Sequence, residues 1–263
     1  MPSIINTNLS SLNTQRSLNS SQGDLSQALE RLSSGLRVNS SKDDAAGLAI
    51  ATTMDAQNRG NQVAIRNATD AISRAQTAEG ALQKQTDALQ RMRELAVQAA
   101  NGTNSSTDQA NLNAEFTQLQ SELSRLSTGT KFNGVDAFGS ASYQIGAGTA
   151  DTLTTASVGA QTLSQAISST ATATAAIAAI DTALSAVNTS RATLGAIQNR
   201  FESVIGSLQI NVENGQAARS RIMDADFAME TANLTRAQIL QQAGTAMLAQ
   251  ANQLPNNVLS LLR

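Results

Sequence analysis

The last forty or so residues, from Ala225 to Arg263, carry a heptad repeat that constrains the fold more than any other stretch of the sequence. Small residues fall in one column of the repeat and larger apolar residues in a second. The columns are Ala237, Gly244, Ala251 and Val258, and Leu240, Met247, Leu254 and Leu261. Two such columns held over about four heptads predict a helix that packs lengthwise against another helix. Further apolar residues widen the band, so we expect more helical neighbours than one folded monomer supplies.

The N-terminal segment also carries an apolar helical pattern. Between Ile4 and Leu36, leucines recur at helical spacing, although Gly23 and many Ser and Asn residues make a weak helix in isolation. We expect this segment to pair with the C-terminal helix, so that the two ends of the chain meet. The alternative is two independent amphipathic tails.

Three further helices are predicted between these ends. A long apolar stripe covers 44–100, and Ser41 with Asp43 and Asp44 suits the capping of its N-terminus better than an acid/base or cation site. After a turn at 101–104, Ser106 and Gln109 form a candidate capping box for a helix closed by Gly129. A third helix starts near Ile177, and we expect it to loosen at Asn214-Gly215.

Residues 130–174 are rich in Gly, Ser, Thr and Ala, and they contain two strand-like pieces, Tyr143–Ile145 and Thr152–Val158. We therefore expect a mostly α fold, a long antiparallel helical bundle or coiled coil with a small β-hairpin region in the middle of the chain. The predicted parts are terminal helices at 1–40 with 225–263, a bundle at 41–135 with 175–224, and a short β or variable insert at 136–174. We place that insert at the end of the bundle far from the termini.

The composition argues against several classes of function. There is no Cys and no His, which removes thiolate chemistry, the usual general base and the commonest metal ligand. No nucleophile elbow or phosphate loop is present, and Gly146-Ala147-Gly148 is better explained as a flexible surface linkage. A net charge of −2 favours neither nucleic acid nor an anionic membrane. No basic, apolar leader and no run of about 18 apolar residues is found, so we expect no cleaved signal and no membrane insertion. We expect no enzyme, no cofactor and no metal site.

Several long motifs resemble bacterial flagellin. They are Leu29 to Ser40 (LERLSSGLRVNS) with Asp43 to Gly47 (DDAAG), Leu194 to Glu202 (LGAIQNRFE), Ala218 to Asp226 (ARSRIMDAD), and Arg236 to Gly244 (RAQILQQAG). The resemblance covers about 1–146 and 175–263 and implies a self-assembling subunit of the flagellar filament used in swimming motility. It also implies that the terminal helices form an inner tube, folding on polymerisation, and that the bundle forms an outer tube. Only about thirty residues stand where many flagellins insert large outer domains, so this is a short form.

The resemblance also implies partners and site residues. The implied partners are a homopolymer of many copies, a flagellar export chaperone, filament cap and junction proteins, and Toll-like receptor 5 of hosts. Export would run unfolded through the flagellar type III apparatus to an extracellular flagellum. The polymerisation residues are Leu9, Leu12, Leu25, Leu29, Leu32, Leu240, Met247, Ala251, Leu254, Val258 and Leu261. The residues for Toll-like receptor 5 are Gln90, Arg91, Leu95 and Glu115, and those for cytosolic receptors are Leu259, Leu261 and Leu262. The alternative within the same axial family is a hook–filament junction protein.

Overall fold

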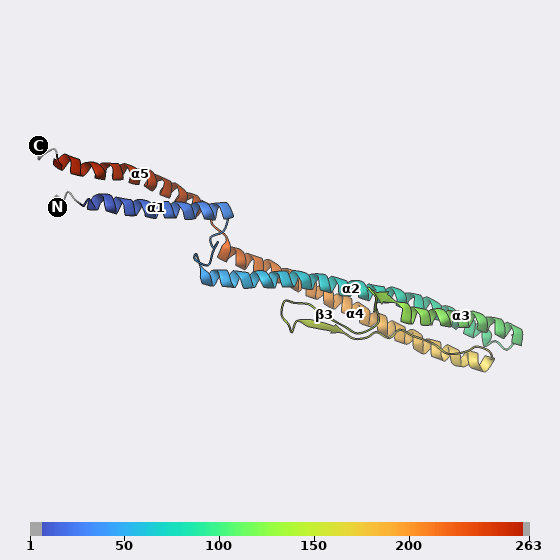
Figure 1. Ribbon diagram of the computed structural model, residues 1–263. Coiled ribbons are helices and arrows are strands. Elements are labelled where there is room, and N and C mark those ends of the chain that lie inside the picture. The colour runs from blue at the N-terminus through green and yellow to red at the C-terminus, as the bar shows by residue number, and fades with distance from the viewer. Residues whose placement is uncertain (1–6, 260–263) are drawn as a thin grey trace. The chain divides into compact units, whose positions relative to one another are not determined.

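The computed structural model describes residues 7–259, with side chains up to residue 253, and the described chain is mostly helical (Figure 1). The helices are α1 (Leu9–Ser34), α2 (Ala45–Ala99), α3 (Ser106–Gly129), α4 (Thr170–Met223) and α5 (Phe227–Leu259), and the strands are β1 (Lys131–Phe132), β2 (Val135–Asp136), β3 (Ala141–Gln144) and β4 (Thr152–Thr155). They form two compact units, one from the two ends of the chain (Met1–Asp55 with Asn214–Arg263) and one from Ala56–Glu213. The predicted fold class is confirmed.

In the first unit, α1 and α5 lie side by side and antiparallel (Figure 1). The buried and half-buried positions of α5 follow a heptad, with Glu230, Ala237, Gly244 and Ala251 in one column and Leu234, Gln241 and Leu248 in the other. The small column was predicted, and it packs on α1: a Cβ added at Gly244 would lie 3.2 Å from Leu18 Cδ1. The predicted column of Leu240 and Met247 was wrong for this contact, because those side chains are exposed. The small column allows the two backbones to approach closely, and this close approach, not the burial of the largest side chains, determines which face of α5 contacts α1.

Two short connectors, one that follows α1 and one that precedes α5, are bonded to each other. Leu36 and Asp224 form an antiparallel bridge, the Ala225 N–H donates to the Gly35 carbonyl (2.9 Å), and the Arg37 N–H donates to the Met223 carbonyl (2.6 Å). Gly35 ends α1 in the left-handed region (φ 72°), where glycine has no Cβ penalty. Around this crossing Val38, Ala51 and Met223 form a small core.

The start of α2 differs in detail from the prediction. Its N-terminus is capped by Asp44, whose Oδ1 accepts from the Gly47 N–H (2.8 Å), and not by Ser41. Asp43 instead ties the preceding turn, since its Oδ2 accepts from the N–H groups of Asn39 and Ser40. These backbone bonds and the Ser40 hydroxyl lower the pKa of Asp43. Asp43 and Asp44 do not form an acid/base pair, because each carboxylate accepts backbone hydrogen bonds from a different turn.

In the second unit, α3 and the parts of α2 and α4 that belong to it enclose one long core. Its largest fully buried side chains are Leu82, Leu89, Met92, Leu95, Phe116, Leu123, Ile167, Ile180 and Val187. The capping box of α3 is Ser105 with Asp108, one residue before the predicted pair. The expected loosening at Asn214-Gly215 is wrong, since α4 continues to Met223. One stretch of α4 is long and apolar enough to cross a membrane, although its buried residues, such as Ala173 and Ile180, belong to this core.

The β region forms two small hairpins. In the first, β1 and β2 are joined by Asn133-Gly134, both at positive φ (48° and 78°), the signature of a type I′ turn. In the second, β3 pairs with β4 and Tyr143 stands opposite Leu153. The predicted hairpin is thus confirmed, but not at the far end of the bundle. It lies along α2 and α4, where Leu153 packs with Ala68, Ala71 and Phe201 in a second core.

Arg74 of α2 holds this β region in place. The side chain is 7% exposed, and its guanidinium donates to the Asp136 carbonyl (2.8 Å), to the Gly139 carbonyl and to the Tyr143 hydroxyl (2.9 Å). The Tyr143 ring in turn meets Phe201 edge-on, with centroids 5.4 Å apart. One cation therefore fastens both hairpins to the bundle.

From residue 156 to 169 the chain runs extended along the bundle without forming a strand. Side chains of the helices fix it: Gln85 Oε1 accepts from the Gln161 N–H, Asn113 Oδ1 accepts from the Ile167 N–H, and the Ser190 hydroxyl donates to the Gly159 carbonyl. Ile167 is fully buried in the main core. This strap was not predicted from the sequence.

Candidate assembly surfaces

The α1–α5 pair exposes several large apolar side chains. On α1 these are Leu9 (68% exposed), Leu12 (50%) and Leu29 (50%), and on α5 they are Phe227 (56%), Met229 (65%), Ile239 (60%), Leu240 (49%) and Met247 (62%). Large apolar side chains exposed together on one pair of helices indicate a surface that binds another protein. The pair therefore has an inner, small-residue seam and an outer, large-residue face.

Polar contacts hold the seam at its two ends. At the end near the termini, the Asn8 side-chain amide donates to the Ala251 carbonyl (2.7 Å), and the Ser11 hydroxyl donates to Asn252 Oδ1 (2.8 Å). Between the two ends the fully buried side chains are small, namely Ala28 and Ala237. A seam of small residues buries little apolar area, so it contributes little stability by itself.

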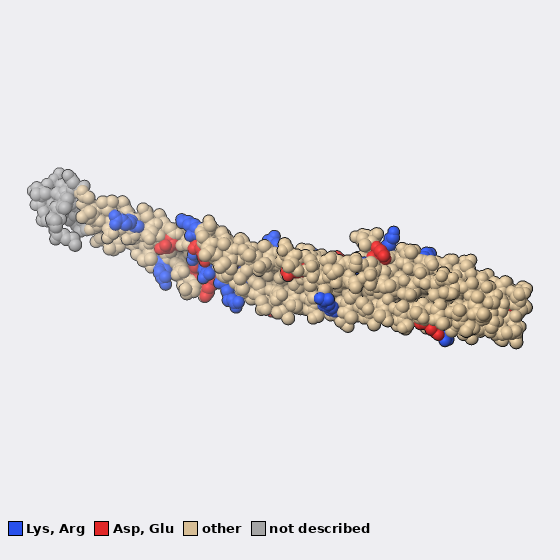
Figure 2. Space-filling model, turned by 90° about the horizontal axis from the view of Figure 1, so that it is seen from below, with Lys and Arg blue, Asp and Glu red and all other residues tan. Residues whose placement is uncertain are grey.

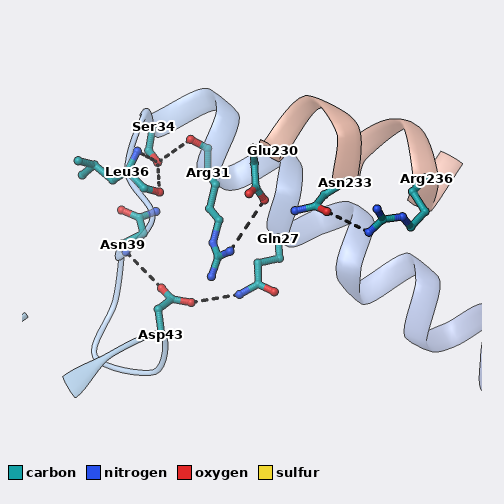
Figure 3. Close-up of polar contacts among 9 residues, drawn as sticks. All are labelled: Gln27, Arg31, Ser34, Leu36, Asn39, Asp43, Glu230, Asn233 and Arg236. Atoms are coloured by element: carbon teal, nitrogen blue, oxygen red, sulfur yellow. Dashed lines mark hydrogen bonds and ion pairs between the residues drawn. The ribbon is translucent and has the colours of Figure 1, made fainter. Parts of the chain in front are cut away.

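At the other end, Arg31 of α1 faces Glu230 of α5, with Nη1 and Oε1 3.9 Å apart (Figure 3). Arg31 lies in the last turn of its helix and Glu230 in the first turn of its own, where the two helix dipoles favour these charges. Glu230 is 8% exposed, and it is the only buried carboxylate among the described residues. Next to it, Arg236 donates to Asn233 Oδ1 (3.2 Å).

The predicted polymerisation residues fall into three groups. Leu25 and Leu32 are half-buried and Ala251 is buried in the α1–α5 pair, whereas Leu9, Leu12, Leu29, Leu240 and Met247 are exposed. The side chains of Leu254 and Val258, and the whole of Leu261, lie outside the described residues. Sequence reasoning missed Glu230, although it stands one heptad before Ala237 and a charge in an apolar column is a detectable signal.

The four residues predicted for Toll-like receptor 5 divide between surface and core. Gln90, Arg91 and Glu115 are exposed on α2 and α3, but Leu95 is 1% exposed and belongs to the main core. Arg91 joins the two helices through its bond to Glu115 (2.9 Å) and also pairs with Glu94 on its own helix (3.0 Å). Hydrogen bonds to Glu94 and Glu115 raise the pKa of Arg91, so it keeps its charge. Leu259, Leu261 and Leu262, predicted for cytosolic receptors, lie outside the residues whose side chains are described.

Charge elsewhere is sparse. On the face drawn in Figure 2, charged side chains of both signs lie close together toward the end nearer the grey atoms and stand singly elsewhere, without a broad patch of one sign. Among the described residues no group of three or more His, Cys, Asp and Glu side chains could hold a metal ion.

Comparison with known proteins identifies the family of the chain. Residues 5–143 match the family model of the bacterial flagellin N-terminal helical region, and residues 177–262 match that of the C-terminal helical region. The chain is 46% identical over 271 residues to a flagellin of Halalkalibacterium halodurans, covering 99% of this chain and 100% of the relative. It is 40% identical over 285 residues to the flagellar filament 33 kDa core protein of Treponema phagedenis, covering 99% and 100%. The crystal structure of Bacillus cereus flagellin is 34% identical, covers 54% of this chain and 88% of that one, and has a TM-score of 0.49. The chain belongs to the bacterial flagellin family, whose members self-assemble into the filament that drives swimming.

Proposed function

We propose that α1 and α5 complete their folding only when the subunit docks onto other copies in the flagellar filament. The observation that carries the proposal is the exposure of large apolar side chains on this pair, among them Leu9, Leu12 and Leu29 with Ile239, Leu240 and Met247. In this assignment 1–40 with 225–263 form the inner tube, 41–135 with 175–224 form the outer tube, and 136–174 is a short variable insert. Contacts that repeat head to tail without closing a ring produce an open helical filament.

The energy balance favours folding coupled to assembly. Within the pair, the buried residues are Ser11, Ala28, Glu230, Ala237 and Ala251, none of which is a large apolar side chain. Covering these six exposed apolar side chains alone in a filament would add on the order of 5 kcal/mol per subunit, since full burial contributes about 1.5–3 kcal/mol each and they are already about half covered. Ordering two long helices costs backbone entropy at every residue, and the pair alone buries little large apolar side chain to offset it.

Truncation tests this proposal. A chain that starts at Asn39 or ends at Asp226 should remain monomeric, while the full chain should polymerise and gain helical circular dichroism at 222 nm as it does so. The control is the same chain with Val135→Ala, which shortens an exposed apolar side chain (61% exposed) outside the terminal helices. Normal filaments from either truncation, or no gain of helix on polymerisation, would refute coupled folding.

We also propose that Toll-like receptor 5 binds the surface around Arg91. Gln90, Arg91 and Glu115 are accessible there, whereas Leu95 contributes only by supporting α2 from within the core. Arg91→Ala should weaken receptor signalling by purified monomer. The matched control is Arg125→Ala, since Arg125 is an exposed, ion-paired arginine of α3. Equal potency of the two variants would reject this assignment. For cytosolic receptors we keep Leu259, Leu261 and Leu262 as the proposed residues.

The remaining partners are proposed from the family. Export unfolded through the flagellar type III apparatus, without a cleaved signal, would involve a chaperone at the C-terminal helices, and assembly would involve cap and junction proteins. We propose no catalytic role, because the chain has neither His nor Cys. A hook–filament junction protein is the remaining alternative, and copy number distinguishes it: a filament subunit should dominate the protein sheared from cells.

A further inference from the structure

We propose that the Arg31–Glu230 pair fixes the rotation of α5 about its own axis, and thereby selects which face of α5 is left for neighbouring subunits. The proposal rests on the filament role above, but it concerns the packing of α5 on α1 within one subunit. Its starting point is the placement of a carboxylate, 8% exposed, in the same column as Ala237, Gly244 and Ala251.

Apolar burial alone does not explain the observed rotation. The face that α5 turns toward α1 contains Ala237, Gly244 and Ala251, whereas Leu240 and Met247, which are larger, point outward and are about half exposed or more. Leu240 follows Ala237 by three residues, so the two columns are about 60° apart around the helix. A rotation of that size would bring Leu240 and Met247 to α1 but would carry the half-buried Leu234 and Leu248 away from it, so the apolar area buried does not by itself select the observed face.

The ion pair opposes this rotation. Turning α5 by about 60° would carry the Glu230 carboxylate away from Arg31, and a buried charge that loses its partner is strongly unfavourable. The charged groups beside the pair cannot replace Arg31, because the nearby Arg236 is already bonded to Asn233, and Asp24 carries the same sign as Glu230. In Figure 3, Arg31 extends from α1 toward Glu230, while Arg236 points along its own helix to Asn233. A single polar pair in an apolar seam commonly sets the packing of two helices in this way.

The connectors at Gly35 and Ala225 already fix where α5 begins along α1, through the 2.9 Å bond between their backbones. They do not determine which side chains of α5 face inward one or more turns later. Asn252 and the Ala251 carbonyl support the same face at the other end of the seam. Arg31 and Glu230 therefore act as positioning residues for the assembly surface.

Disulfide trapping can test the rotation, since the chain has no Cys of its own. Leu18→Cys with Gly244→Cys reports the observed face, because the Leu18 Cβ and a Cβ built at Gly244 are 3.9 Å apart, within the range for a disulfide. Leu18→Cys with Met247→Cys reports the rotated face. Each pair is placed in the unchanged chain, in Glu230→Gln, in Glu230→Arg and in the charge exchange Arg31→Glu with Glu230→Arg. Variants are grown as a minority onto filament seeds of the unchanged chain.

In the unchanged chain the 18–244 disulfide should dominate. Glu230→Arg should lower the ratio of 18–244 to 18–247 disulfide by about tenfold or more, Glu230→Gln should lower it less, and the charge exchange should restore it. A ratio that stays the same in Glu230→Arg and Glu230→Gln overturns the proposal, as does a charge exchange that fails to restore it. If Glu230→Arg is not incorporated, restored incorporation of the charge exchange supports the proposal, and equal exclusion of both overturns it. A failure of coupled folding is recognised separately, since the unchanged chain would then show the 18–244 disulfide equally in monomer and filament.

Discussion

Replacing Arg74 should loosen the β region while leaving the helical bundle intact. Arg74→Ala removes the donors of two backbone carbonyls, Asp136 and Gly139, and of the Tyr143 hydroxyl. These bonds are only partly buried, so each lost bond should cost about 1 kcal/mol of unfolding free energy, and we expect a loss of about 3 kcal/mol for the three together. For a unit of this size that corresponds to a fall in melting temperature of about 6–12 °C.

The chain offers a convenient assay for this change. It has one tyrosine and no tryptophan, so tyrosine fluorescence reports Tyr143 alone, while circular dichroism at 222 nm reports the helices. In Arg74→Ala the fluorescence transition in urea should move to lower concentration and separate from the helical transition. The control is Arg66→Ala, an exposed arginine of the same helix, which should change stability by no more than about 0.5 kcal/mol. If Arg74→Ala loses no more than Arg66→Ala, or if both signals move together without separating, Arg74 is not the fastening of the β region.

Two further predictions concern the second unit. Phe201→Ala should lower the free energy of unfolding by about 3–5 kcal/mol, because the ring is fully buried. The same change at Phe227, which is 56% exposed, should lower it much less. Equal losses of stability in thermal melts would contradict the assigned core. The pKa of Asp108 is lowered by the Ser105 hydroxyl and backbone N–H, so its stabilisation is complete above the ordinary value of 3.8 and is lost as the pH falls through the lower folded value. Asp108→Asn should therefore flatten the dependence of urea stability on pH below about 4, and an unchanged slope would show that the capping carboxylate does not contribute.

Elements with long periodic stripes were predicted well from the sequence. The helix expected over 44–100 is observed as Ala45–Ala99, because fifty residues of consistent spacing leave no competing structure. The capping box was displaced by one residue, since Ser105 and Ser106 are adjacent and each has a polar side chain three positions later. The strand pieces around Tyr143 and Thr152 were found because the tract was short and bounded by glycines.

The failures share one physical cause, namely that the deciding contacts are distant in sequence. The strap from 156 to 169 is fixed by Gln85 and Asn113, which lie 76 and 54 residues from their bonding partners, and no local pattern announces such bonds. The inward face of α5 was misjudged because large apolar residues were expected to be buried first. Glycine at 244 and the charge at Glu230 decide that face instead, through close approach and ion pairing with α1.

The paired connectors have a mechanical consequence. The Gly35–Ala225 and Arg37–Met223 backbone hydrogen bonds join the segment that follows α1 to the segment that precedes α5. A pull on α5 is thereby passed along the covalent chain to the end of α4 and, through the hydrogen bonds, to the segment that follows α1. In a rotating fibre built of such subunits, each connector would therefore carry part of the load placed on the terminal helices.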